Sequence, residues 1–282
     1  NLVGMNDYLR TVPGANFIDS DVSSSTVILR GLALDETGSS SFAYGSLTGV
    51  YFGETPVTGL GTAGNSADIK LVDMERIEVL KGPQGTLYGA GAMGGVVRNI
   101  PAAPDLDGFL GGVKVGYSNT ARLGGNNADL EAFVNVPLIE DRLAVRAVAY
   151  QIDNSGYYRN ISALDPDAVA FAEARDLNTT IKEDVGASTY AGGRVSALWT
   201  PTDKLSITLG YLHQEIDVSG QGQGDVEIGG LYDQSRLLVP KGTTLANASA
   251  PINDENRGDT IDLAHATIDY DFDWAALKSI TS

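Results

Sequence analysis

The sequence predicts two parts: an α+β unit over residues 1–105, and about seven antiparallel strands over residues 106–282 that form the first part of a transmembrane β-barrel. Three observations predict this fold class. The first part holds two strand-like segments separated by the glycine-rich run 82–95. The strands of the second part alternate strictly between apolar and polar residues, and their connections alternate between tight turns and long loops.

The first part combines short elements with long loops. We expect a helical turn at 7–11, strands at 26–30, 50–52, 76–80 and 96–100, and a helix at 66–74. Ser66 is a suitable N-cap for that helix, with Asp68 in its first turn. Glycine reaches positive φ without steric cost, so the run 82–95 is expected to fold tightly between its two strands. We expect a packed unit of loops and sheet of this kind to be enclosed by a surrounding structure.

The second part has the alternation of half-buried strands. Between residues 129 and 136 the apolar side chains share one face: Leu130, Ala132, Val134 and Val136. The polar side chains Asp129, Glu131 and Asn135 share the other face. The same period of two recurs near residues 113, 142, 194, 205 and 264, over runs of about 8 to 12 residues. Strands of this length can cross a bilayer when they are tilted.

The connections between these strands alternate in length. Tight turns are expected at 138–141, 201–204 and 271–273, and long links at 154–188 and 217–258. Tight turns on one rim and long loops on the other are typical of outer-membrane β-barrels. Structureless loops this long are uncommon in compact soluble domains.

Composition limits the function. The net charge of −17 and the pI of about 4.3 argue against nucleic-acid binding, which needs a basic face. The absence of cysteine excludes thiol catalysis and cysteine-based zinc sites. No apolar run approaches the ~18 residues of a membrane-spanning helix, so a membrane role would use strands. The chain starts without a signal peptide and ends in a strand at 274–282, so we expect it to be a piece of a longer chain.

Several segments resemble the TonB-dependent receptors, the plugged active transporters of Gram-negative outer membranes. The resemblance is carried by residues 12–14, 28–31, 50–52, 75–89 and 94–95, and by 136–143 and 199–203 at the first two periplasmic turns. Its most specific part is GPQGTLYG at 82–89. The resemblance implies a plug over 1–105 and the first strands of a barrel that has about 22 in this family. The energy-coupling segment of the family is expected to precede residue 1.

The resemblance implies transport and no enzymatic reaction. We expect energy-coupled uptake of a scarce nutrient, such as a ferric siderophore, another metal chelate, cobalamin or an oligosaccharide. The implied partners are an inner-membrane TonB-type complex, the small-molecule substrate and outer-membrane lipid, with no cofactor and no nucleic acid. The long barrel loops each carry an excess of acidic residues, so we expect a neutral, cationic or metal-chelated ligand.

The resemblance also implies site residues. Tyr88, near the apex of the plug, is the first candidate for ligand contact, and Tyr44 and Asn65 in the neighbouring loops are further candidates. Arg30 and Lys81 are expected to contact the barrel wall. The family usually has arginine at position 81, and an ammonium group cannot make the two parallel bonds that a guanidinium makes with a carboxylate. We therefore expect a weaker contact there.

Other interpretations of the same residues are less consistent with the sequence. Residues 89–94 match G-x-G-x-x-G, but a dinucleotide site needs a helix directly after the glycines, and Val96, Val97 and Pro101 disfavour one. His213 and His265 lie on different faces of their strands, without neighbouring metal ligands. The remaining alternative is a non-transporting surface protein, an adhesin or structural sheet, which would not need a glycine-rich plug.

Two further groups of residues have more than one interpretation. The acidic turns 165–167 and 269–273 could bind a divalent cation or hold solvated carboxylates. Trp199 and Trp274, beside the tight turns, are expected at the membrane interface, although aromatic side chains near strand ends can also face the lumen.

Overall fold

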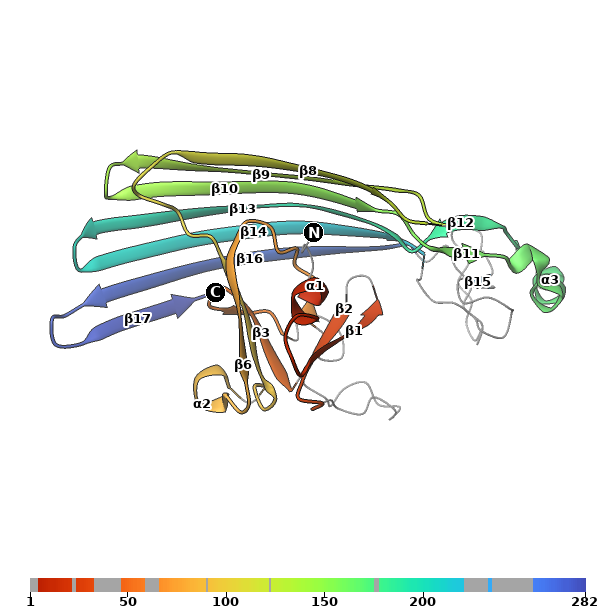
Figure 1. Ribbon diagram of the computed structural model, residues 1–282, viewed down its shortest axis with the longest axis horizontal. Coiled ribbons are helices and arrows are strands. Elements are labelled where there is room, and N and C mark those ends of the chain that lie inside the picture. The colour runs from red at the N-terminus through yellow and green to blue at the C-terminus, as the bar shows by residue number, and fades with distance from the viewer. Residues whose placement is uncertain are drawn as a thin grey trace.

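The structure is a computed structural model that describes residues 5–21, 24–32, 47–58, 66–89, 91–121, 123–174, 178–220, 233–234 and 256–282. Seven long strands lie side by side as a curved wall, and the elements of the plug lie against its concave face (Figure 1). No helix in the described ranges is long and apolar enough to cross a membrane.

The wall confirms the predicted antiparallel sheet. Its strands are β8 (Leu110–Asn119), β9 (Asn126–Ile139), β10 (Leu143–Asn154), β13 (Ala187–Thr202), β14 (Leu205–Ser219), β16 (Arg257–Asp271) and β17 (Ala276–Thr281). They pair in sequence order, each antiparallel to the next. The sheet is not closed, since β8 and β17 are its two edges. The tight turns lie at one end of the strands and the long links at the other (Figure 1).

The two faces of the wall differ as the alternation predicts. The outward face carries exposed apolar side chains: Val113, Val115, Tyr117, Leu130, Val195, Trp199, Leu209, Tyr211 and Ile268. The inward face carries Phe133, Val148, Tyr150, Tyr190, Leu212 and Ile216, which pack with each other and with the plug. An apolar face turned away from the plug is the face that lipid covers in a membrane barrel.

In the described ranges the plug contains two small sheets and two short helices. Its elements are α1 (Met5–Leu9), β1 (Ala15–Asp21), β2 (Ser24–Leu29), β3 (Thr48–Phe52), β4 (Thr55–Pro56), β5 (Ser66–Ala67), β6 (Met74–Lys81), α2 (Gly85–Tyr88) and β7 (Gly95–Pro101). One sheet has the order β1-β2-β5 and the other the order β4-β3-β7-β6. Leu29, Val50, Phe52, Val57 and Val97 form the centre of the core, which extends to Leu212 and Leu263 of the wall.

One glycine of the plug is required by close packing. Gly95 has a φ of 145°, and a side chain there would collide with the carbonyl group of Leu80 and the side chain of Leu29. The glycine-rich run therefore lets β7 approach β6 as closely as the sheet requires. The strand β7 begins directly at Gly95, so no helix follows the G-x-G-x-x-G match, as expected.

The predicted helix at 66–74 is wrong. Residues 66 and 67 form β5, and residues 68–73, which we call the strap, form neither helix nor strand and lie against the wall. The amide of Lys70 and the carbonyl of Asp68 bond to Gln214 on β14, so these backbone groups are not available for a helix. A partner 144 residues away overrides the local helical signal.

The link between β10 and β13 has structure of its own. It contains β11 (Tyr158–Asn160), the 3-10 turn η2 (Ser162–Leu164), α3 (Pro166–Glu173) and β12 (Lys182–Val185). Asp165 is the N-cap of α3 and accepts a hydrogen bond from the amide of Asp167, which favours a structural role for this acidic turn. In the link between β14 and β16 the structure describes β15 (Asp233–Gln234), which pairs with β11.

Candidate functional site

The strap docks on the wall through a buried glutamine. Gln214, on the inward face of β14, is fully buried. Its Oε1 accepts from the amide of Lys70 at 2.9 Å, and its Nε2 donates to the carbonyl of Asp68 at 2.8 Å. The side-chain amide of Gln214 thus makes two hydrogen bonds with the backbone of the strap, one as acceptor and one as donor.

Side chains of the strap and wall complete this contact. The hydroxyl of Tyr150 donates to Gln214 Oε1 at 2.8 Å, and that of Tyr190 donates to Asp68 Oδ2 at 2.8 Å. Lys70 Nζ lies 3.1 Å from the same carboxylate and 3.6 Å from the centre of the Tyr190 ring. Each of these polar groups therefore has a partner where water is largely excluded.

At its other end the strap is held by a buried ion cluster, which we call the clamp. Asp73 accepts from Arg146 Nε at 2.7 Å and Nη2 at 2.5 Å, and from Arg194 Nη2 at 2.9 Å. Arg194 also donates to the carbonyl groups of Val72 and Asp73. The side chains of all three charged residues are at most 8% exposed. Bidentate guanidinium–carboxylate geometry makes such contacts strong and directional.

The wall is shaped to present these side chains. Gly192 on β13 lies beside Tyr150, and a Cβ at position 192 would be 2.6 Å from the tyrosine hydroxyl. Gly112 on β8 likewise leaves room for Phe133, whose ring lies 4.4 Å from the guanidinium of Arg146. Glycine on one strand thus makes space for an aromatic ring on the next.

The plug and the wall are also joined at two other places. In the connection between β7 and β8, Asn135 of β9 accepts from the amide of Asp105 and donates to the carbonyl groups of Asp105 and Gly108. On the other side of the plug, Glu54 lies 3.0 Å from Arg98 of β7 and 3.3 Å from Lys278 of β17. The buried strap, the contacts of the buried Asn135 and the Glu54–Lys278 ion pair therefore hold the plug against the described strands.

One carboxylate of the plug sheet has a perturbed titration. Glu78 accepts from Arg76 Nε at 2.7 Å and from Arg98 Nη1 at 2.8 Å. The hydrogen bond from Arg76, and then the positive charge of Arg98, lower the pKa of Glu78. The pKa of Glu78 therefore lies below that of an ordinary glutamate, and its carboxylate links β6 to Arg98 of β7.

Tyr88 is the last residue of α2 and is half-buried. Its ring packs edge-on against Tyr51 with the ring centres 5.1 Å apart, and the Tyr51 hydroxyl donates to the Tyr88 carbonyl at 3.1 Å. Burial raises the pKa of Tyr51. Tyr44 and Asn65 lie outside the described residues. Ligand contact by Tyr88, Tyr44 and Asn65 therefore stays a prediction.

The two residues expected to contact the wall have their described contacts within the plug. The Lys81 ammonium donates to the carbonyl of Pro13 at 2.6 Å, and the Arg30 amide donates to the carbonyl of Gly14 at 2.7 Å. Contact of Arg30 and Lys81 with a barrel wall stays a prediction. The plug residues that contact the described wall through their charge are Asp73 and Glu54, and sequence reasoning selected neither of them. One signal for the Asp73 contact was available in the sequence. Arg146 lies on the inward face of a wall strand, so it needs an acidic partner from the plug.

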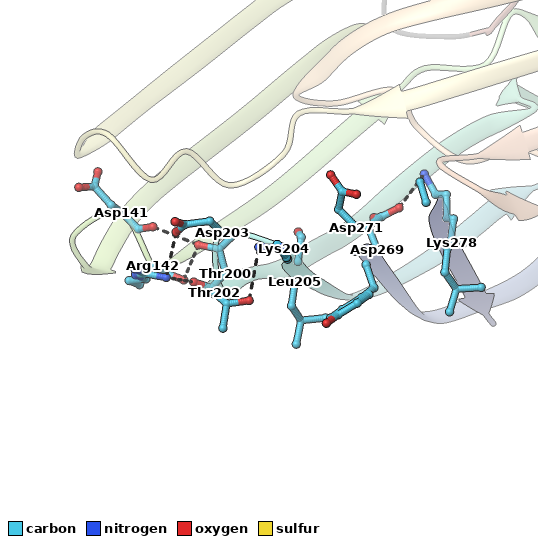
Figure 2. Close-up of a pocket in the computed structure, with 14 residues that line it drawn as sticks. Asp141, Arg142, Thr200, Thr202, Asp203, Lys204, Leu205, Asp269, Asp271 and Lys278 are labelled. Carbon is cyan, nitrogen blue, oxygen red and sulfur yellow. Dashed lines mark hydrogen bonds and ion pairs between the residues drawn. The ribbon is translucent and has the colours of Figure 1, made fainter. Parts of the chain in front are cut away.

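The tight-turn rim carries a groove of about 400 Å³ (Figure 2). Its charged side chains are paired locally: Arg142 lies 3.6 Å from Asp203, and Lys278 lies 3.9 Å from Asp269. Arg142 also donates to the carbonyl groups of Thr200 and Pro201. The contacts of Arg142 connect two neighbouring turns. The described residues include no cluster of His, Asp and Glu suited to a metal ion.

Comparison with known proteins matches the plug to a family model, and relatives extend the likeness to the wall. Residues 2–96 match the family model TonB-dependent Receptor Plug Domain. The pesticin receptor of Yersinia pestis is 33% identical over 97 residues, which cover 34% of this chain and 13% of that protein. The probable TonB-dependent siderophore receptor PirA of Acinetobacter baumannii is 25% identical over 236 residues, which cover 80% of this chain and 28% of that protein.

Solved structures extend the likeness to the wall. The ferric yersiniabactin uptake receptor FyuA from Yersinia pestis has a TM-score of 0.70 at 20% identity, covering 97% of this chain and 36% of that one. The siderophore receptor PirA from Acinetobacter baumannii has a TM-score of 0.65 at 18% identity, covering 99% and 36%. The chain thus spans about a third of the length of these solved receptors. Residues 2–96 thus match a TonB-dependent receptor plug domain, and the chain as a whole has the fold of the plug and part of the β-barrel of these outer-membrane receptors.

Proposed function

We propose that the intact receptor takes up a ferric siderophore across the outer membrane, with energy from an inner-membrane TonB-type complex. The observation that carries this proposal is the docking of the plug on the wall through the buried strap and clamp. A plug held by buried hydrogen bonds and ion pairs stays in place without an input of energy, and a force on it supplies the free energy needed to release it. An adhesin has no use for such a plug.

The substrate class is proposed from the relatives. The matched proteins include receptors named for ferric yersiniabactin, ferripyoverdine and ferric enterobactin. The acidic balance of this chain disfavours highly anionic ligands and favours neutral, cationic or metal-chelated ones. Tyr88 is the proposed contact in the described part of the plug, with Tyr44 and Asn65 in the loops beside it. We keep the predicted boundary between residues 105 and 106 as the proposed end of the plug domain.

A growth and binding experiment tests the proposal. Cells that make the intact receptor, or lack it, are grown under iron limitation with a panel of ferric siderophores, and in parallel with cobalamin or an oligosaccharide as the limiting nutrient. We expect receptor-dependent growth with at least one ferric siderophore. Growth on none of the iron sources, together with receptor-dependent adhesion, would favour the surface-protein alternative. A preference for highly anionic ligands that persists at low salt would contradict the expected ligand charge.

A further inference from the structure

The groove at the tight-turn rim lies on the same face of the wall as the plug. Ser206 of β14 pairs with Asp269 of β16, and Asp269 pairs with Lys278 of β17. Partners directly across a strand pair share one face of the sheet, and Lys278 reaches Glu54 of the plug at 3.3 Å. All three wall residues line the groove (Figure 2). The groove is therefore part of the inward face of the wall.

The wall and its turns supply every residue that lines this groove. The lining includes basic side chains such as Arg142 and Lys278, acidic ones such as Asp269 and Asp271, and the hydroxyl of Ser206. Charges of both signs and hydroxyl groups keep such a surface hydrated. The rim thus has a hydrated hollow beside the plug, and the plug does not line it.

The plug reaches the edge of the groove through an exposed ion pair. Glu54 lies in the turn between β3 and β4, and β4 is the edge strand of its sheet, with two residues. The side chains of Glu54 and Lys278 are 33% and 49% exposed. Water screens an ion pair of this kind, so it contributes little to holding the plug on the wall.

Both charges of this pair keep a partner when they separate. Glu54 lies 3.0 Å from Arg98 within the plug, and Lys278 lies 3.9 Å from Asp269 within the wall. The clamp differs in this respect, because departure of Asp73 would leave two buried arginines without the carboxylate that they share. Separation at Glu54 is therefore less costly than separation at the clamp.

We propose that the plug first separates from the described wall at Glu54 and Lys278, and that the substrate leaves along the groove beside this pair. The strap and the clamp stay docked during this step, so the plug is held at one place while it opens at another. Openings of a protein start where its contacts are weakest. The charged and hydroxyl groups of the groove suit a hydrated, polar substrate. Since the step is part of the proposed uptake, it rests on that function.

Cysteine labelling in cells tests the order of these movements. The chain has no cysteine, so each thiol introduced into it is unique there. Cells make the intact receptor with Glu54→Cys or Lys70→Cys, and they receive a nutrient that the receptor takes up, with or without a protonophore. A maleimide should label Glu54→Cys several times faster when the proton motive force is present. It should label Lys70→Cys slowly in both cases, because this strap side chain is 11% exposed and stays docked.

Entry of the same nutrient through the unsubstituted receptor is measured in parallel. If nothing enters, the proposed uptake fails, and this step fails with it. If the nutrient enters but the labelling of Glu54→Cys does not depend on the proton motive force, the proposed uptake stands and this step is overturned. Faster labelling of Lys70→Cys in energised cells would also overturn it, because the strap would then leave the wall.

A tether and a blocked groove test the route. Glu54→Cys and Lys278→Cys, joined by a short reducible bifunctional thiol reagent, should let the nutrient bind but stop its entry, and a reductant should restore entry. A bulky maleimide on Ser206→Cys should also stop entry. The same label on Ser279→Cys should not, because Ser279 pairs with Ile268 on the outward face of the same rim. Normal entry through the tethered receptor, or equal entry with the label at either serine position, would overturn the proposal.

Discussion

Replacing Asp73 by asparagine tests how the strap is held on the wall. The Asp73 carboxylate is 8% exposed and accepts from Arg146 at 2.5 and 2.7 Å and from Arg194 at 2.9 Å. Asparagine has nearly the same shape and tolerates the positive φ of 54° found at this position. Asp73→Asn therefore removes the negative charge and one acceptor oxygen while it keeps the backbone conformation.

The expected cost is large because the two arginines remain buried. Removing one partner of a buried ion pair costs about 3–5 kcal/mol, most of which is the penalty of leaving the other charge without a partner. Since 1.4 kcal/mol corresponds to a factor of ten, docking of the plug should weaken by about two to four orders of magnitude. Replacing Arg146 by methionine in the same chain should recover part of this loss, because it removes one of the unbalanced charges.

The assay is hydrogen exchange and limited proteolysis of the plug in the intact receptor, with thermal unfolding in detergent. Asp203→Asn is the control: this carboxylate is 96% exposed and lies 3.6 Å from Arg142, so its removal should cost less than about 1 kcal/mol. Equal protection of the plug in the Asp73 and Asp203 variants would refute the view that the clamp holds the strap.

Three further predictions concern packing and charge. Gly192→Val should push Tyr150 away from the strap and destabilise the plug–wall contact by about 1–3 kcal/mol, measured by thermal unfolding. Gly95→Ala should destabilise the plug by about 2–5 kcal/mol and make it sensitive to protease, because its φ of 145° and its close packing both exclude a side chain. Glu78 has a lowered pKa in the folded protein, so its stabilising contribution is present above its unfolded pKa and is lost as the pH falls through the folded pKa. Glu78→Gln should therefore lower the melting temperature at about pH 7, and its difference from the parent should shrink as the pH falls and the Glu78 carboxylate becomes protonated.

Matched controls separate these effects from non-specific damage. Gly85→Ala, where a new Cβ would meet no atom within 4 Å, should leave the melting temperature and the protease pattern unchanged. A Gly192 or Gly95 variant that behaves like Gly85→Ala would contradict the packing argument. Glu140→Gln, on the exposed turn between β9 and β10, serves as the acidic control. A pH dependence of Glu78→Gln no different from that of this control would contradict the charge argument.

The wall could be predicted from the sequence because its signal is local and repeated. Alternation along β9 already places Leu130 and Val134 on one face and Glu131 on the other, and the structure has them so. Tight turns follow from short polar connections such as Asp203 and Lys204. In a membrane strand, apolar residues that face lipid alternate with polar residues that face the lumen, so the strand can be recognised from its own sequence.

The strap and the clamp could not be predicted in the same way. The segment 68–73 has a local sequence suited to a helix, and contacts with residues far along the chain, such as Gln214, make the non-helical strap the better solution. Asp73 is an ordinary acidic residue until the fold places Arg146 and Arg194 beside it. Contacts between distant segments depend on the register of the whole wall, which no local window contains.

The most direct test of the central claim is uptake by cells that make the intact receptor. A ferric siderophore labelled with radioactive iron is supplied with and without a protonophore that collapses the proton motive force. The plugged-receptor account predicts that the label binds to the cells in both cases but enters them only when the proton motive force is present. Entry at the same rate after its collapse would contradict the account, because a plug held on the wall by the strap and clamp should not let the substrate pass without energy.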